Sequence, residues 1–228
     1  MNTTNMTKSV SEASTRGTFI KKTYMHLALA LMGFALLEYF LLGLPQMAEL
    51  AGKMYEGYNY LIVMGLFMFV SYIANKWALN SESASMQYAG LSLFVVAEAV
   101  ICAPLLLIAN ALVPEAIPQA AYLTLAMFLG LTAIVLFTGK DFSFLRSILI
   151  MCSFLALGLI VCSIIFGFQL GLLFTGAMII FASFSIIYQT SAILHEYNEN
   201  QYVAASLGIF ASVILLFWYI LQFLIRRD

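Results

Sequence analysis

The sequence predicts an all-α membrane protein with seven transmembrane helices. Seven apolar stretches with almost no internal charge occupy most of the chain, and each approaches the roughly 20 residues that a helix needs to cross about 30 Å of hydrocarbon. Of the 228 residues, 63% are hydrophobic and 9% are charged, against about 25% charged in soluble domains. Only helices and closed barrels satisfy the backbone in lipid, and these stretches are too long for barrel strands.

The apolar stretches give the expected spans in chain order. The first follows the basic pair Lys21-Lys22, and the third contains Pro104. Tyrosines, which favour the membrane interface, open the first, second, third and seventh spans. The expected ranges are 24–42, 58–74, 88–108, 117–137, 144–166, 170–190 and 202–225.

The domain organisation follows from the short segments between spans, which are typical of a compact bundle. We expect one seven-helix membrane domain over residues 19–228. Residues 1–18 are polar, and we expect a disordered N-terminal tail there. In the last span, Ala205, Gly208 and Ser212 form a stripe of small residues. Because close packing at small residues holds helices together in lipid, this stripe predicts that the last helix packs inside the bundle.

Basic residues beside the spans predict the orientation, because cytoplasmic loops carry an excess of Lys and Arg. With a cytoplasmic N-terminus, seven of the ten Lys and Arg residues lie on the cytoplasmic side and three lie outside. The outer pair Arg226-Arg227 argues the other way, but the first helix and the early loops usually dominate. We therefore expect a cytoplasmic N-terminus and an outward C-terminus.

Composition argues against several classes of function. The net charge of -1 leaves no basic face for nucleic acid. Cys102, Cys152 and Cys162 lie in expected spans without a CxxC motif or a nearby His pair, so we interpret them as structural thiols and expect no metal or cofactor. No apolar region with a small-residue cleavage site precedes the first span, so we expect no signal peptide.

We do not expect an enzyme. Gly90-Leu-Ser92 resembles the start of an intramembrane serine-protease motif, and His195 would share the depth of that serine. The residue after the serine is Leu93, however, where the motif normally has Gly. The last span contains no Lys for a retinal Schiff base, and the spans contain no carboxylate pair suited to an aspartyl protease.

Glu98 lies in the middle of the third span, six residues before Pro104. Ionisable residues inside a membrane are costly and are functional candidates by default. Glu98 is either a proton or cation site beside a kinked helix, or a protonated side chain hydrogen-bonded to a neighbouring helix. Glu38 lies toward the outer end of the first span, and we interpret it as a solvated residue at the helix end. We interpret His26 as an interfacial hydrogen-bonding residue.

The end of the sixth span is polar. Its polar residues are Ser185, Tyr188, Gln189, Thr190 and Ser191, with His195 and Glu196 just beyond. Such a cluster either lines a water-filled vestibule open to the cytoplasm or is an ordinary polar helix end. Ser212 in the last span is the expected facing partner.

Several motifs appear in order along the chain. They are Ala74-Asn75-Lys76, the Pro104 helix, Lys140-Asp141-Phe-Ser-Phe-Leu145, Ile187-Tyr-Gln-Thr-Ser-Ala-Ile-Leu-His195 and Gln201-Tyr-Val-Ala-Ala-Ser-Leu-Gly-Ile-Phe-Ala-Ser212. In this order, within seven spans, they resemble the Bax inhibitor family, most closely its bacterial YccA-like branch. The likeness extends from about Phe19 to Asp228.

The resemblance implies a seven-helix fold in a bacterial inner membrane, with the C-terminal helix at the centre of the other six. It also implies a link to calcium leak and cell-stress control, and contact with a membrane-bound ATP-dependent protease. Members that leak calcium use two aspartates, in the sixth and seventh helices, as a pH-sensitive latch. The matching positions here are Gln189 and Ser212, which hydrogen-bond but do not titrate, so this latch is absent.

The leading hypothesis is therefore a non-enzymatic inner-membrane protein that leaks a cation, with calcium the implied ion, or has a related stress-linked role. The candidate polar path is Glu98, Tyr188, Gln189 and Ser212, and the candidates on the cytoplasmic side are Lys76, Asp141, Arg146 and His195. The expected partner is the lipid bilayer. The alternative is a regulator or interaction partner of a membrane-bound ATP-dependent protease, held through residues 1–17.

Overall fold

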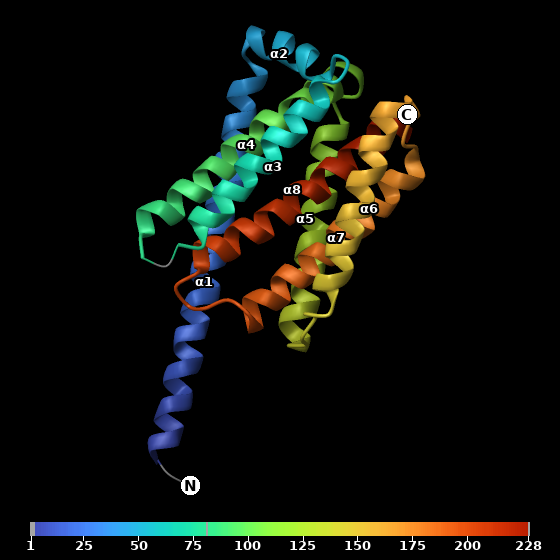
Figure 1. Cartoon of the computed structure of the whole chain (residues 1–228). Helices are drawn as coiled ribbons and strands as arrows, with labels where there is room; N and C mark the ends of the chain where they lie inside the picture. The colour runs from blue at the N-terminus through green and yellow to red at the C-terminus, as the bar shows by residue number, and fades with distance from the viewer. Residues whose placement is uncertain (1–2, 81, 228) are drawn as a thin grey trace.

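The computed structural model describes residues 3–80 and 82–227, and these residues form eight helices (Figure 1). The helices are α1 (Thr3–Leu42), α2 (Pro45–Tyr55), α3 (Asn59–Ala78), α4 (Ala84–Leu112), α5 (Ala116–Thr138), α6 (Leu145–Phe166), α7 (Leu172–His195) and α8 (Tyr202–Arg227). All but α2 are long and apolar enough to cross a membrane. The prediction of an all-α protein with seven spans is thereby confirmed.

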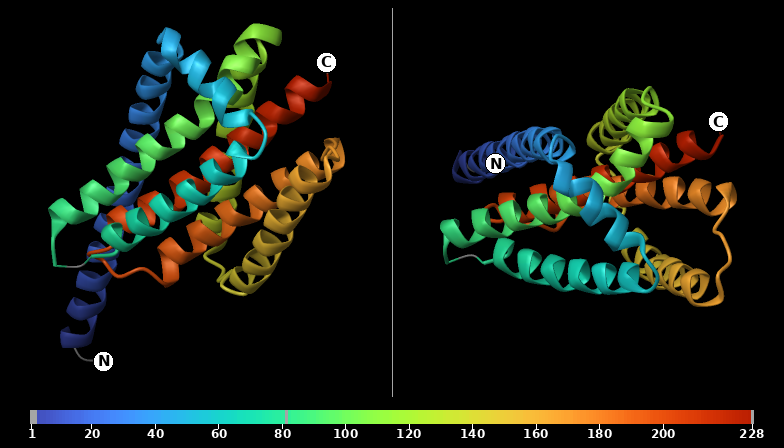
Figure 2. Two further views of the ribbon diagram at one scale, coloured as in Figure 1. Left: turned by 45° about the horizontal axis from the view of Figure 1, so that its top comes forward. Right: turned by 90° about the horizontal axis from the view of Figure 1, so that it is seen from above.

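Helix α8 lies in the middle of the bundle and packs against α1, α3, α4, α5 and α7 (Figure 2). In α4 and α8, 56% of the most apolar stretch is buried, against 28% or less in the other spans. Ala205 and Ser212 of the small-residue stripe are buried in this position. Helix α6 is more peripheral and packs mainly on α7. The C-terminal helix is therefore central, as predicted, with five of the other spans around it.

Glycines end the spans α5 and α6, and another glycine allows α3 and α4 to pack closely. Gly139 after α5 and Gly167 after α6 have φ of 59° and 71°, a left-handed conformation that favours glycine at helix ends. Gly90 on α4 faces α3, where an added Cβ would lie 2.5 Å from the carbonyl oxygen of Ala74. Gly90 is thus a packing residue at the α3–α4 contact.

Helix α2 was not predicted, because its 11 residues are too few for a span. It begins with Pro45 at its first turn, where a missing N–H costs nothing. Met47, Ala51 and Met54 are buried at helical spacing, and α2 packs on the ends of α3 and α4. The helix covers one end of the bundle, visible at the top of Figure 1, which we call the C-terminal end. The end where α7 finishes and α8 begins is the N-terminal end.

Helix α1 begins at Thr3, inside the segment for which we expected disorder. Its backbone continues without a break into the first span, and its first turns project beyond the bundle (Figure 1). The membrane-spanning stretch within it starts at Ser14. The division between a tail and the membrane domain near residue 18 stays a prediction.

Candidate functional site

Glu98 lines a cavity of about 350 Å³ between α3, α4, α7 and α8. The cavity lining is mostly apolar. The lining residues that carry hydroxyl groups are Ser71, Ser185, Ser212 and two tyrosines. Glu98 itself is 9% exposed. A carboxyl group at this depth, beside hydroxyl groups and open space, can bind a proton or a desolvated cation.

The hydroxyl groups of Ser185 and Ser212 join α7 to α8 at the cavity wall. Their oxygens are 2.7 Å apart, and Ser212 also donates to the carbonyl oxygen of Gly208 at 3.1 Å. The hydroxyl oxygen of Ser71 on the α3 wall is buried and has no hydrogen-bond partner in the described part of the chain. Ser71 thus adds a hydroxyl group without a described hydrogen-bond partner to the residues that line the cavity with Glu98.

Gln189 lies one turn from Ser185 on α7, toward the N-terminal end. Its side-chain oxygen is buried and has no hydrogen-bond partner among the described residues. This oxygen would lie 2.7 Å from a Cβ added to Gly208. Gln189 and Ser212 thus face the same α7–α8 contact, but only Ser212 lines the Glu98 cavity. Gln189 therefore packs on Gly208 at this contact, one turn nearer the N-terminal end than the cavity wall at Ser185.

A second cavity of about 450 Å³ adjoins the first toward the C-terminal end. Tyr60, Trp218 and Tyr219 line both cavities. The second cavity also has polar side chains, among them Gln222 and Arg226, and the guanidinium group of Arg226 donates to the carbonyl oxygen of Leu170. Three aromatic side chains therefore separate Glu98 from a more polar chamber at the C-terminal end.

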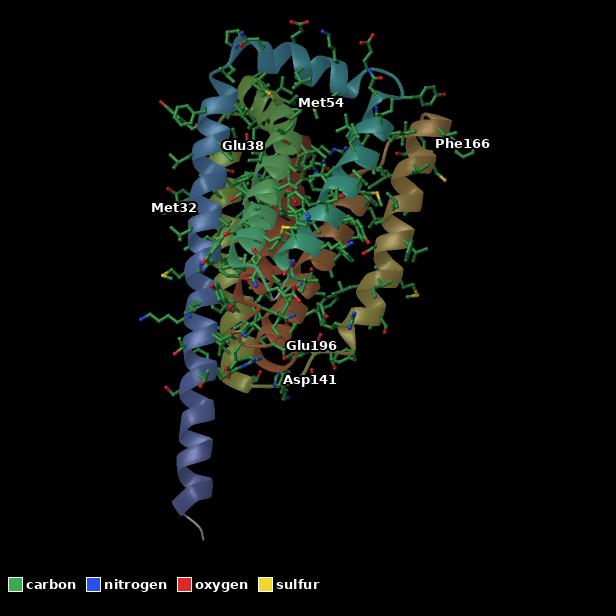
Figure 3. The ribbon with its side chains drawn as sticks, turned by 60° about the vertical axis from the view of Figure 1, so that its left-hand side comes forward. Met32, Glu38, Met54, Asp141, Phe166 and Glu196 are labelled. Atoms are coloured by element: carbon green, nitrogen blue, oxygen red, sulfur yellow. The ribbon has the colours of Figure 1, made fainter. Side chains whose placement is uncertain are left out.

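The Asp141 motif lies at the N-terminal end, away from Glu98. The backbone N–H of Ser143 donates to the Asp141 carboxylate at 2.8 Å and its hydroxyl group at 3.2 Å. These bonds hold the pKa of Asp141 below its usual range. The N–H of Phe142 donates to the Ser191 hydroxyl oxygen at 2.8 Å. The motif thus joins the α5–α6 loop to the end of α7, and Figure 3 shows both Asp141 and Glu196 at this end of the bundle.

The remaining candidates also lie near the N-terminal end. Tyr188 donates to the carboxylate of Glu196 at 3.1 Å and does not line the Glu98 cavity. His195 is exposed, with its Nδ1 3.0 Å from the carbonyl oxygen of Ser191. Lys76 and Arg146 are exposed at the last turn of α3 and the first turn of α6. The structure therefore brings together Glu98 and Ser212, but not Tyr188 or the charged candidates.

Ser92 and His195, the two residues considered for a serine protease, lie in different surroundings. Ser92 is exposed and lines a groove between α1 and α4 beside His26 and Tyr88, whereas His195 contacts Ser191 on α7. His26 bridges the carbonyl oxygen of Lys22 at 2.7 Å and the Tyr88 hydroxyl group at 3.2 Å, as expected of an interfacial hydrogen-bonding residue. Among the described residues, no group of three or more His, Cys, Asp or Glu side chains is placed to hold a metal ion.

Arg16 is a structural residue that the sequence did not reveal. Its guanidinium group donates to the carbonyl oxygens of Tyr197 at 2.6 Å and Ile193 at 2.5 Å. These carbonyls lie at the end of α7, where backbone acceptors lack partners and a positive charge is favourable. The contacts join positions 177 and 181 residues apart, and no local sequence pattern predicts them.

We expect Arg16→Ala to lower the free energy of unfolding by about 1 kcal/mol, because it removes charge-assisted bonds to the end of α7. Thermal unfolding of the protein in detergent measures this change. Lys21→Ala removes an exposed positive charge from the same helix and should have little effect. Equal effects of the two substitutions would contradict the role given to Arg16.

Glu38 contradicts the expectation of a solvated helix end. It is 5% exposed, and neither carboxyl oxygen has a hydrogen-bond partner in the described part of the chain. Leu106 of α4, Thr124 of α5 and Ile214 of α8 line the same space as Glu38. The expectation was wrong because three neighbouring helices cover the last turns of α1.

Comparison with known proteins places the chain in a family. The family model described as Inhibitor of apoptosis-promoting Bax1 matches residues 16–228. An uncharacterized protein of Pseudomonas aeruginosa is 38% identical over 109 residues, which are 46% of this chain and 48% of the relative. The Golgi anti-apoptotic protein of Vaccinia virus (strain Lister) is 36% identical over 113 residues, 46% of this chain and 45% of the relative.

The aligned part thus spans about half the length of these curated relatives. The family model, in contrast, covers almost the whole chain, including six spans in full and all but the first two residues of the remaining one. The chain belongs to the Bax inhibitor family.

Proposed function

We propose that this multipass membrane protein leaks a cation, with the carboxyl group of Glu98 as the site that the ion or a proton occupies. The observation that carries the proposal is the placement of Glu98 in a cavity against the central helix α8. A carboxylate there costs several kcal/mol unless it is paired or faces water or an ion. Carboxylate oxygens are also among the ligands that calcium prefers.

The two adjoining cavities support access from the C-terminal end, which we propose faces outward while the N-terminal end faces the cytoplasm. Tyr60, Trp218 and Tyr219 line both cavities, so a rotation of these side chains would join them. On the other side, Gln189 packs on Gly208. In such a resting state an ion would reach Glu98 from the C-terminal end. Its passage to the N-terminal end would require movement of α7 relative to α8.

Flux through proteoliposomes tests this proposal. We expect Glu98→Gln to lower calcium flux at least about tenfold. Of the described residues, Glu98 alone brings a carboxyl group to the lining of this cavity, and the substitution removes that group while keeping the side-chain volume. Glu115→Gln is the matched control, since Glu115 is exposed at the C-terminal end. Equal flux in the unmodified protein and Glu98→Gln would remove Glu98 from the mechanism.

The second candidate is an interaction partner of a membrane-bound ATP-dependent protease. The observation that favours it is the projection of the first turns of α1 beyond the bundle (Figure 1). An accessible segment of this kind can be gripped by a protease. This role needs no conduction, so an inert Glu98 cavity would favour it over the leak.

A further inference from the structure

A groove of about 500 Å³ lies between α1 and α5, with α4 and α8 as its floor. Its lining is almost entirely apolar: Leu106, Val213 and Phe217 form part of the floor. The rim includes Ala35 on α1 and Ala121 on α5, both exposed. Because all four helices are membrane spans, this groove opens sideways toward lipid rather than toward water.

Two unpaired polar side chains interrupt this apolar lining. Glu38 is 5% exposed and Thr124 is 4% exposed. Neither carboxyl oxygen of Glu38 nor the hydroxyl oxygen of Thr124 has a hydrogen-bond partner in the described part of the chain. Burying such groups without partners is costly. Both residues line the groove, so a donor that enters the groove would supply the missing partner once the side chain turns toward it.

The depth of Glu38 fits a lipid headgroup. Glu38 lies four residues before Leu42, the last residue of α1, which corresponds to about 6 Å along the helix axis. Figure 3 shows Glu38 near the α2-covered end of α1. The apolar lining extends from Glu38 toward the middle of the bundle through Phe34 and Leu31. A lipid with its polar end at Glu38 would place an acyl chain along this lining.

We propose that this groove binds an aminophospholipid of the phosphatidylethanolamine type, with the acyl chain in the groove and the ammonium group on Glu38. The ammonium group supplies three N–H donors and a positive charge to two unpaired carboxyl oxygens. An anionic headgroup would meet the Glu38 carboxyl group without a compensating charge. A choline headgroup carries the same charge as ethanolamine but has no N–H to donate.

Native mass spectrometry of the purified full chain tests the proposal. The delipidated protein is mixed with equal amounts of phosphatidylethanolamine and phosphatidylcholine that carry the same acyl chains. We expect about tenfold greater retention of phosphatidylethanolamine, the preference typical of a hydrogen bond to a charged group. Glu38→Gln should abolish this preference, whereas Glu115→Gln, at an exposed position at the same end, should keep it.

A second variant tests the groove itself. Ala121→Trp places a large side chain at the exposed rim and should lower retention of both lipids. Equal retention of the two lipids by the unmodified protein would overturn the proposal, as would an unchanged preference in Glu38→Gln. Unchanged retention in Ala121→Trp would show that the lipid binds elsewhere. Thermal unfolding of each variant in detergent verifies that it is folded, and none of these outcomes depends on ion flux.

Discussion

Gly90→Leu is expected to prevent stable folding of the bundle. A Cβ added to Gly90 would lie 2.5 Å from the carbonyl oxygen of Ala74 and 2.7 Å from the backbone nitrogen of Ala78. Both atoms belong to the backbone of α3, so no side-chain rotation relieves the contact and the two helices must separate. Even Gly90→Ala should cost about 1–3 kcal/mol of unfolding free energy, the range for an overpacked core.

Gly130 in α5 is the matched control, because nothing lies within 4 Å of a Cβ added there. Alanine favours a helix interior over glycine by about 1 kcal/mol, so Gly130→Ala should leave stability unchanged or raise it. Thermal unfolding in detergent, with the yield of monodisperse protein, measures the stability of all three variants. If Gly90→Ala is as stable as the unmodified protein, the close α3–α4 crossing is not required.

Much of the fold could be predicted, because membrane helices must satisfy their own backbone and be long enough to cross the hydrocarbon. The position of α8 also followed from local residues, since Ala205, Gly208 and Ser212 permit close contact. Helix α2 could not be found in this way. Its signal is three buried residues at helical spacing in 11 residues, which a search for spans ignores.

The candidate site was only partly predictable. Glu98 and Ser212 stand out because polar residues are rare inside spans, and the structure brings them to one cavity. Tyr188 is one residue from Gln189, but successive residues on a helix point about 100° apart, and Tyr188 reaches Glu196 instead. The direction of its side chain depends on how α7 is rotated, which the sequence alone does not give.

Arg16 and Glu38 show the limit of sequence patterns more clearly. The partners of Arg16 are carbonyl groups 177 and 181 residues away, and any residue type could supply them. Glu38 lies close enough to a helix end to reach water, yet α4, α5 and α8 cover it. In both cases the decisive fact is which distant backbone or helix lies beside the residue, and hydropathy carries no information about that.

The double substitution Gln189→Asp/Ser212→Asp should make calcium flux depend on pH. Both positions face the α7–α8 contact, and Ser212 shares a cavity with Glu98. Carboxyl groups that share a site lose their protons in coupled steps, and ionised carboxylates bind calcium far better than protonated ones. Ionisation increases with pH, so flux should be higher at about pH 8 than at about pH 6, by roughly tenfold.

Gln189→Asn/Ser212→Asn is the matched control, because it introduces polar groups of similar size that do not titrate. Its flux ratio between the two pH values should equal that of the unmodified protein, measured in the same proteoliposomes. An equal flux ratio between the two pH values in the aspartate variant would contradict a site shared by these positions.

Flux in the unmodified protein would establish a leak that needs no aspartate latch and direct attention to Glu98. Flux gained only in the aspartate variant would mean that the scaffold is intact and its channel chemistry is lost, and the role as a protease partner would then be favoured.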